Sequence, residues 1–210
     1  MTVTLSDVLN WIARLQTIYH ENRQYLTDLD AAIGDADHGI NLDRGFCAVQ
    51  TELVKTAPAD ISAALKVVAM TLIRSVGGAS GPLYGTFFLR ASAYTAARSE
   101  LDASDVVEMF KVGIEGIQQR GKAEAGDKTM LDTLLPALAA MQSTLKENSN
   151  LSSILTAAAQ AAQQGMAATV PLQAKKGRAS YLGERSMGHQ DPGATSAFWL
   201  IQAASELWRK

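Results

Sequence analysis

The stretch that decides the fold class is Leu5–Tyr19, LSDVLNWIARLQTIY, close to the start of the chain. Its apolar side chains recur every three or four residues, which is the spacing of an amphipathic α-helix; they are Leu5, Val8, Leu9, Ile12, Leu15 and Tyr19. Thr4 and Asp7 at its start are typical of a capping arrangement that satisfies free backbone amides. The pattern predicts a helix that begins after Thr4 and buries one face.

The same spacing recurs along most of the chain, whereas sustained period-two alternation and short hairpin turns are missing. It predicts helices over residues 39–51, after Asp60, from Pro82 onward, from a cap at Asp102 or Ser104 to a C′ glycine at Gly121, and near 130–146, 150–168 and 194–209. We therefore expect one all-α domain over residues 1–210, with about eight helices.

The composition of the chain excludes several classes of protein. The chain has 210 residues, 47% of them hydrophobic and 19% charged, so it is large enough to bury a core. The net charge of -2 excludes a broadly basic nucleic-acid binder, and a single cysteine, Cys47, excludes an internal disulfide. The N-terminus lacks a basic leader and a cleavage site, and no apolar run approaches the ~18 residues of a membrane span. We expect a mature cytoplasmic protein without membrane contact.

The first of four glycine-bearing loops, Leu29–Asn41, carries three aspartates, Asp30, Asp35 and Asp37. On an extended backbone Asp35 and Asp37 point to the same side, and Gly34 would let the chain turn so that Asp30 joins them. Clustered carboxylates repel one another unless a cation neutralises them, and their hard oxygens suit Mg²⁺ or Ca²⁺. The alternative is that these aspartates only cap helices and form turns.

The other loops offer groups that suit phosphate. Ser75–Pro82 has small residues before a helix N-terminus, which also describes a flexible turn. The long segment Pro171–Gly193 contains a basic cluster with Arg178, either for a transferring phosphoryl group or as a solvated surface. Asp191 caps the last helix or helps to hold a ligand there. His38, beside the aspartates, is either a ligand or base or a packing residue.

A near-match to a P-loop is rejected. Gly116–Ala123 fits G-x-x-x-x-G-K, but it ends in alanine where Mg²⁺ binding requires a hydroxyl, and Gly116 falls inside an expected helix. The residues alone indicate a helical protein that binds Mg²⁺ and phosphate, in the manner of a phosphotransferase.

Several blocks resemble one known family. They are GDADHG (34–39) with NLDRGF (41–46), SVGGASGPLYGTFF (75–88), RGKAEAGDKTM (120–130) and KKGRASYLGERSMGHQDPGATS (175–196). The chain resembles the nucleotide-binding L subunits of the phosphoenolpyruvate-dependent bacterial dihydroxyacetone kinases. This resemblance implies a closed barrel of eight antiparallel helices, with nucleotide bound among the loops at one end.

The resemblance also implies roles for individual residues. Asp30, Asp35 and Asp37 would hold Mg²⁺, as a pair of ions bridging the nucleotide phosphates, and Arg178 would be catalytic. The residues implied to bind the nucleotide are His38, Gly39, Ile40, Asn41, Ala79, Ser80, Gly121, Met130, Arg178, Asp191, Pro192 and Gly193.

In the implied reaction, bound ATP gives its γ-phosphoryl group to dihydroxyacetone on a separate K subunit. A phosphohistidine of an M subunit then rephosphorylates the retained ADP, so that the nucleotide acts as a coenzyme. We expect no sugar pocket in 210 residues, and hence no activity without these partners. The alternatives are a related kinase subunit with another acceptor, such as a fatty acid on a binding protein, and a non-catalytic nucleotide-dependent regulator.

Overall fold

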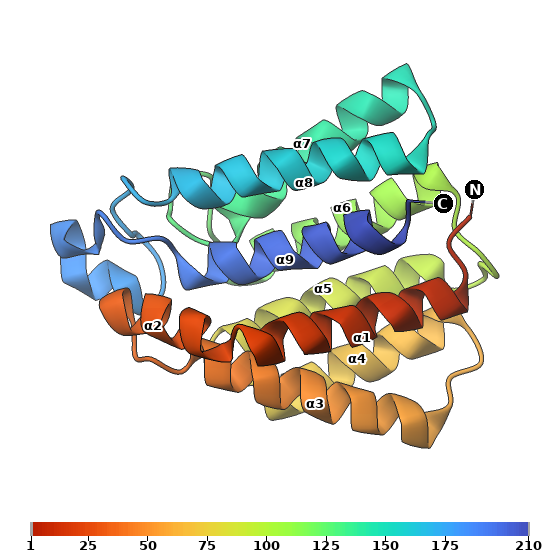
Figure 1. The fold of residues 1–210 in the computed structure, drawn as a ribbon, viewed down its shortest axis with the longest axis horizontal. Helices are drawn as coiled ribbons and strands as arrows, with labels where there is room; N and C mark the ends of the chain where they lie inside the picture. Colours follow the sequence, from red (N-terminus) through yellow and green to blue (C-terminus); the bar gives the residue numbers. More distant parts are fainter. Residues whose placement is uncertain (1, 210) are drawn as a thin grey trace.

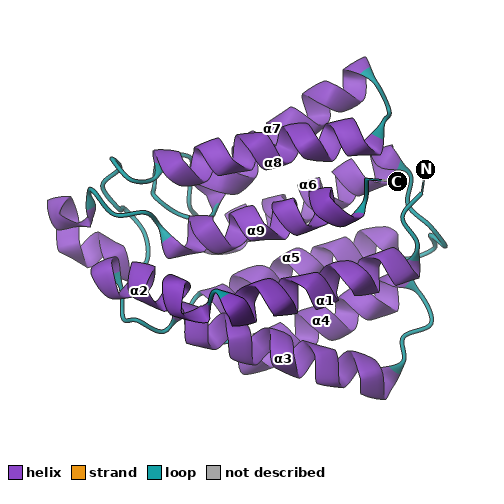
Figure 2. Cartoon of the chain, viewed as in Figure 1, coloured by secondary structure: helices purple, strands orange, loops and turns teal. Residues whose placement is uncertain are grey.

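The computed structural model describes residues 2–209, and helix dominates it (Figure 2). Its elements are α1 (Leu5–Glu21), α2 (Arg23–Ile33), α3 (His38–Thr56), α4 (Ile61–Ser75), α5 (Ser80–Thr95), α6 (Ala103–Gly121), α7 (Leu131–Glu147), α8 (Leu151–Ala168), the 3₁₀ helix η1 (Arg178–Ser186) and α9 (Pro192–Leu207). Within residues 2–209 the one extended pairing is an isolated bridge between Val3 and Leu101. The predicted all-α class is therefore confirmed. None of the helices in this range is long and apolar enough to span a bilayer.

All the long helices except α2 close into a ring (Figure 1). In chain order α1 packs on α3, and then α4, α5, α6, α7, α8 and α9 each pack on the one before, until α9 returns to α1. Neighbours in the ring run antiparallel. The helix α2 extends from one end, where it contacts α3, α9 and η1. This arrangement confirms the closed barrel of antiparallel helices that the resemblance implies.

The seam between α9 and α1 closes the barrel. The indole N–H of Trp11 on α1 donates to the carbonyl of Leu200, 3.1 Å away, and the indole of Trp208 donates to the carbonyl of Asp7, at 3.2 Å. Both tryptophans are fully buried, and their ring centroids lie 5.2 Å apart. Because a buried indole N–H is costly when unpaired, these two hydrogen bonds fix how the first and last helices meet.

Local capping signals set several helix ends as predicted. Thr4 and Asp7 form a reciprocal capping box at the start of α1, and Asp102, not Ser104, caps α6. The predicted end of α6 is wrong in detail. The helix continues through Gly121, and the left-handed residue that follows is Lys122, with φ of 48°.

The periodicity predicts no helix at Arg23–Ile33, but α2 occupies this segment. It follows α1 almost directly, and the side chain of Asn22 makes no capping hydrogen bond to it. The sequence therefore lacks an ordinary start signal here. As a consequence Asp30 lies in the last turn of a helix, and the first loop is shorter than expected.

Antiparallel packing gathers four connections at one end of the barrel, at the left in Figure 1, while both termini lie at the other end. These connections are residues 34–37, 76–79, 122–130 and 169–191. The helices that begin at this end are α3, α5, α7 and α9. Helix N-termini carry free N–H groups and the positive end of the helix dipole, so this end of the barrel favours an anion.

Candidate functional site

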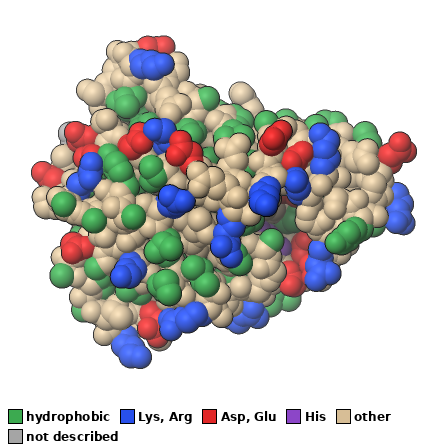
Figure 3. Space-filling view, turned by 180° about the vertical axis from the view of Figure 1, so that it is seen from behind, with side chains coloured by type: hydrophobic (Ala, Val, Ile, Leu, Met, Phe, Trp, Pro, Cys, Tyr) green, Lys and Arg blue, Asp and Glu red, His purple; other side chains and the backbone are tan. Residues whose placement is uncertain are grey.

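A cavity of about 250 Å³ opens between these four connections. Figure 3 shows the molecule from behind, so this end of the barrel lies at the right. A recess there has acidic and histidine side chains within it and basic side chains around it. The cavity brings together most of the residues that the sequence predicts for the site, namely Asp30, Asp35, Asp37, His38, Ala79, Ser80, Gly121, Met130, Arg178, Asp191, Pro192 and Gly193.

The three aspartates form a tight carboxylate cluster in this cavity. One oxygen each of Asp30, Asp35 and Asp37 lies within 4.8 Å of the other two. Asp30 is buried, and its Oδ2 accepts the backbone N–H groups of Asp37 at 2.8 Å and of His38 at 3.1 Å. It therefore shapes the loop as well as contributing charge. Because such close carboxylates repel one another, the cluster fits a divalent cation that prefers oxygen ligands.

The turn that assembles the cluster differs from the prediction in its backbone conformation. Gly34 has φ of -138°, and the left-handed residue in the loop is Ala36, with φ of 61°. Gly34 is required for space, because a Cβ atom there would collide with the carboxylate of Asp30. The chain bends at Gly34, as predicted, and the glycine permits this by leaving space for Asp30 rather than by a positive φ.

His38 lies at the centre of a buried hydrogen-bond chain. Burial lowers its pKa to about 4, so the imidazole is neutral at pH 7, with one donating and one accepting nitrogen. Nδ1 lies 3.0 Å from the hydroxyl of Ser80, and Nε2 lies 2.9 Å from the hydroxyl of Ser196. The hydroxyl of Ser196 also lies 2.7 Å from the hydroxyl of Tyr84 and 3.0 Å from the carbonyl of Gly193, to which it can donate. The chain fixes the starts of α3, α5 and α9 relative to one another.

Arg178 and Asp191 both lie on the segment 169–191, where Arg178 is the first residue of η1 and Asp191 directly precedes α9. Nε of Arg178 forms an ion pair with Oδ2 of Asp35 at 2.7 Å, although the arginine side chain is 69% exposed. Asp191 caps α9 by accepting the N–H of Ala194 at 2.7 Å, and burial raises its pKa to about 7. The capping role of Asp191 is thus confirmed, and its side of the cavity is also the N-terminus of α9.

Lys128 is a residue of this site that the sequence analysis missed. It is 1% exposed, and its ammonium group donates to four backbone carbonyls: Ser186 at 2.7 Å, His189 at 2.6 Å, Leu172 at 3.0 Å and Val170 at 3.4 Å. Burial lowers its pKa. The lysine holds the segment 169–191 against the α6–α7 connection. A single lysine in a glycine-rich loop gives no sequence signal for such a role.

Gly39, Ile40 and Asn41 are not among the described residues that line the cavity. They form the first turn of α3, where Ile40 is 48% exposed and Oδ1 of Asn41 accepts from Arg44 at 2.6 Å. Gly39 packs against α2, because a Cβ atom there would collide with the carbonyl of Arg23. Their contact with phosphate stays a prediction.

The cavity also has apolar walls that the sequence did not indicate, including Ile33, Leu83 and Ala123. Gly116 of the rejected P-loop lies inside α6. The cavity therefore offers carboxylates to a cation, helix N-termini to an anion and apolar walls to a flat ring. This combination suits a nucleotide with a divalent cation.

Comparison with known proteins agrees with this chemistry. Residues 32–206 match the DAK2 domain family. The chain is 47% identical over 202 residues, 96% of each chain, to the ADP-binding subunit DhaL of the PEP-dependent dihydroxyacetone kinase of Escherichia coli strain K12. It is 43% identical over 204 residues to the ADP-binding subunit DhaL of PEP-dependent dihydroxyacetone kinase 1 of Listeria innocua, covering 97% of this chain and 96% of that one.

A solved structure extends the comparison to the fold. The dihydroxyacetone kinase of C. freundii, crystallised with AMP-PNP and Mg²⁺, aligns with a TM-score of 0.74 at 24% identity. The match covers 98% of this chain, which spans 34% of that longer one. By the family match and the near full-length identity, the chain belongs to the DAK2 domain family, among the ADP-binding subunits of phosphoenolpyruvate-dependent dihydroxyacetone kinases.

Proposed function

We propose that this chain carries the nucleotide of a dihydroxyacetone kinase. It transfers the γ-phosphoryl group of bound ATP to dihydroxyacetone on a K subunit, and a phosphohistidine of an M subunit rephosphorylates the ADP in place. The observation that carries the proposal is the cavity itself, which joins a carboxylate cluster to the N-termini of α3, α5, α7 and α9. It occurs in a chain 47% identical to an ADP-binding subunit of such a kinase.

The three aspartates are the proposed ligands of Mg²⁺, as a pair of ions shared with the phosphates. Bound there, Mg²⁺ would neutralise the negative charge of the phosphate groups. The backbone N–H groups at the helix starts, including those at Ala79 and Ser80, would donate to phosphate oxygens. Because the hydroxyl of Ser80 is already hydrogen-bonded to His38, the contribution of Ser80 would come from its backbone.

Arg178 is the proposed catalytic residue. Its ion pair with Asp35 brings the guanidinium to the edge of the carboxylate cluster, where a planar fork can stabilise the charge of a transferring phosphoryl group. Because the side chain of Arg178 is exposed, it is free to reorient when the carboxylate of Asp35 binds a cation. Met130 and Gly121, with the apolar walls, would border the base.

Phosphoryl transfer depends mostly on positioning and charge stabilisation, so the acceptor must be brought to the nucleotide. We propose that the K and M subunits dock in turn at the open end of the barrel, and that this takes place in the cytoplasm, where ADP and phosphoenolpyruvate are available. Serving two partners at one opening requires transient contacts.

The test is a single-turnover assay with the purified chain. With Mg²⁺, ATP and dihydroxyacetone the chain alone should give no product above background, and adding the K subunit should give one dihydroxyacetone phosphate per bound nucleotide. Removal of Mg²⁺ with a chelator should abolish both ADP binding and this turnover. Product from the chain alone, or none with the K subunit present, would contradict the proposal.

A further inference from the structure

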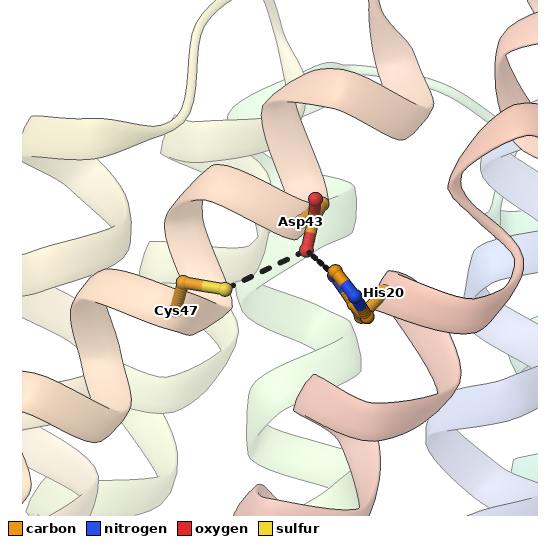
Figure 4. Close-up of side chains that lie close together, drawn as sticks. All are labelled: His20, Asp43 and Cys47. Atoms are coloured by element: carbon orange, nitrogen blue, oxygen red, sulfur yellow. Dashed lines mark hydrogen bonds and ion pairs between the residues drawn. The ribbon is translucent and has the colours of Figure 1, made fainter.

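A second cluster of metal-ligating side chains lies outside the cavity, between α1 and α3 (Figure 4). Nδ1 of His20 is 3.0 Å from Oδ1 of Asp43, and Sγ of Cys47 is 3.5 Å from the same oxygen. The nitrogen, oxygen and sulfur atoms all lie within 4.8 Å of one another. Three different ligand types thus converge on one point of the surface.

The helices themselves create this convergence. Asp43 and Cys47 are four residues apart on α3 and therefore share a face of that helix. His20 lies in the last turn of α1, and Gln16, one turn earlier, donates from Nε2 to Sγ of Cys47 over 3.5 Å. Two pairs at helical spacing thus face each other where α1 packs on α3.

We propose that His20, Asp43 and Cys47 form a binding site for a divalent transition metal of the Zn²⁺ class, with Gln16 or water as the fourth ligand. Tetrahedral zinc with its usual bond lengths places nitrogen, oxygen and sulfur ligands about 3.3–3.6 Å apart. The 3.0 Å and 3.5 Å separations are close to these values, so small side-chain rotations suffice.

The ligand set selects the metal and argues against a nucleophilic site. Thiolate and imidazole favour Zn²⁺ over Mg²⁺, whereas the three aspartates of the cavity have the opposite preference. In a nucleophilic triad the imidazole would contact the thiol, but here the carboxylate of Asp43 lies between them. Partial desolvation raises the pKa of the Cys47 thiol although the residue reaches the surface, so the thiol carries a proton in the metal-free protein. Metal binding would replace the S–H bond with a metal–sulfur bond and release that proton to solvent.

The surroundings leave the site accessible. The side chain of His20 is 62% exposed, that of Asp43 is 11% exposed, and Cys47 is at the surface. Arg23, on α2, lies 3.6 Å from Oδ2 of Asp43 and so pairs with the oxygen that faces away from the cluster. A thiolate and a carboxylate would together neutralise a divalent ion. A bound metal would crosslink the C-terminal end of α1 to α3.

The test is a Co²⁺ titration of tag-free protein, with Cys47 kept reduced and Mg²⁺ in excess to occupy oxygen-rich sites. The wild-type chain should bind one equivalent of Co²⁺ with a thiolate-to-cobalt charge-transfer band, and Zn²⁺ should displace it. Cys47→Ser should lose the band, and His20→Gln should weaken binding at least about tenfold. His189→Gln, which removes an exposed histidine outside the cluster, should behave like wild type.

Because His20 and Cys47 are exposed, their variants should fold, and circular dichroism checks this. No thiolate band in wild type with a titratable thiol would overturn the proposal. So would an unchanged band in Cys47→Ser, or an unchanged affinity in His20→Gln. None of these readouts depends on kinase activity.

Discussion

Replacing Lys128 with methionine should loosen the segment 169–191 while leaving the barrel folded. Methionine keeps the apolar stem of the lysine but removes the ammonium group, which donates to four carbonyls. Three of these hydrogen bonds are 3.0 Å or shorter. Hydrogen bonds to a charged group contribute about 1.5–3 kcal/mol each, so the upper value for the buried bond to the carbonyl of Ser186 alone gives a loss of about 3 kcal/mol.

Tryptic cleavage measures this loss directly. The segment carries four basic residues where trypsin can cut, Lys175, Lys176, Arg178 and Arg185. If cleavage requires local opening, a loss of about 3 kcal/mol raises the open population, and the cleavage rate, on the order of 100-fold. Mass spectrometry should locate the first cut in this segment, and circular dichroism should show unchanged helix content.

The matched control is Lys175→Met in the same segment. The amino group of Lys175 lies 3.8 Å from Asp127, and its side chain is 64% exposed. An exposed ion pair of this kind contributes about 0–1 kcal/mol, so cleavage at Lys176, Arg178 and Arg185, the sites that both variants keep, should change only a few-fold. If Lys128→Met were cleaved no faster than Lys175→Met, the lysine would not hold the segment, and the reasoning would be refuted.

Three further variants, the last with a control variant, test the cavity and its supports. Asp37→Ala should severely weaken Mg–ADP binding in calorimetry while helix content stays intact, because it removes one carboxylate of the cluster; unchanged affinity would exclude Asp37 from the metal site. Arg178→Lys keeps the charge but loses the planar fork, so turnover with the K subunit should fall much more than ADP affinity, and normal turnover would make the arginine a bystander. Gly39→Ala places a Cβ atom against the carbonyl of Arg23 and should lower the free energy of unfolding by about 1–3 kcal/mol in urea titrations. Gly121→Ala, which meets only a flexible leucine atom at 3.3 Å, should cost less than that, and equal losses would disprove the packing role of Gly39.

Local signals made most of the fold predictable. Where a side chain caps a helix, as Thr4 does for α1 and Asp102 for α6, the predicted start agrees with the structure. At α2 neither a capping side chain at Asn22 nor a recognised apolar spacing marks the start, and the sequence predicts no helix there. Closure of the barrel depends on contacts between α9 and α1, which periodicity within a single helix cannot reveal.

The residues of the candidate site that belong to short sequence motifs could be predicted from the sequence. The aspartates and the glycine-rich loops stand out by residue type, and the fold places most of them around one cavity. The contribution of Lys128 depends on carbonyl groups, which every residue possesses, so its role emerges only from the folded backbone. The apolar walls are likewise contributed by single residues of separate elements: Ile33 of α2, Leu83 of α5 and Ala123 of the α6–α7 connection.

The central claim is that the nucleotide stays on this chain and is recharged there. The most direct measurement is the amount of dihydroxyacetone phosphate formed per ADP when the chain, loaded with one equivalent of ADP and Mg²⁺, is combined with the K and M subunits, dihydroxyacetone and a phosphoenolpyruvate relay, without added ATP. We expect continuous formation of product, in large excess over the nucleotide present. Product that stops at one equivalent per nucleotide, or that forms only when ATP is supplied, would contradict it.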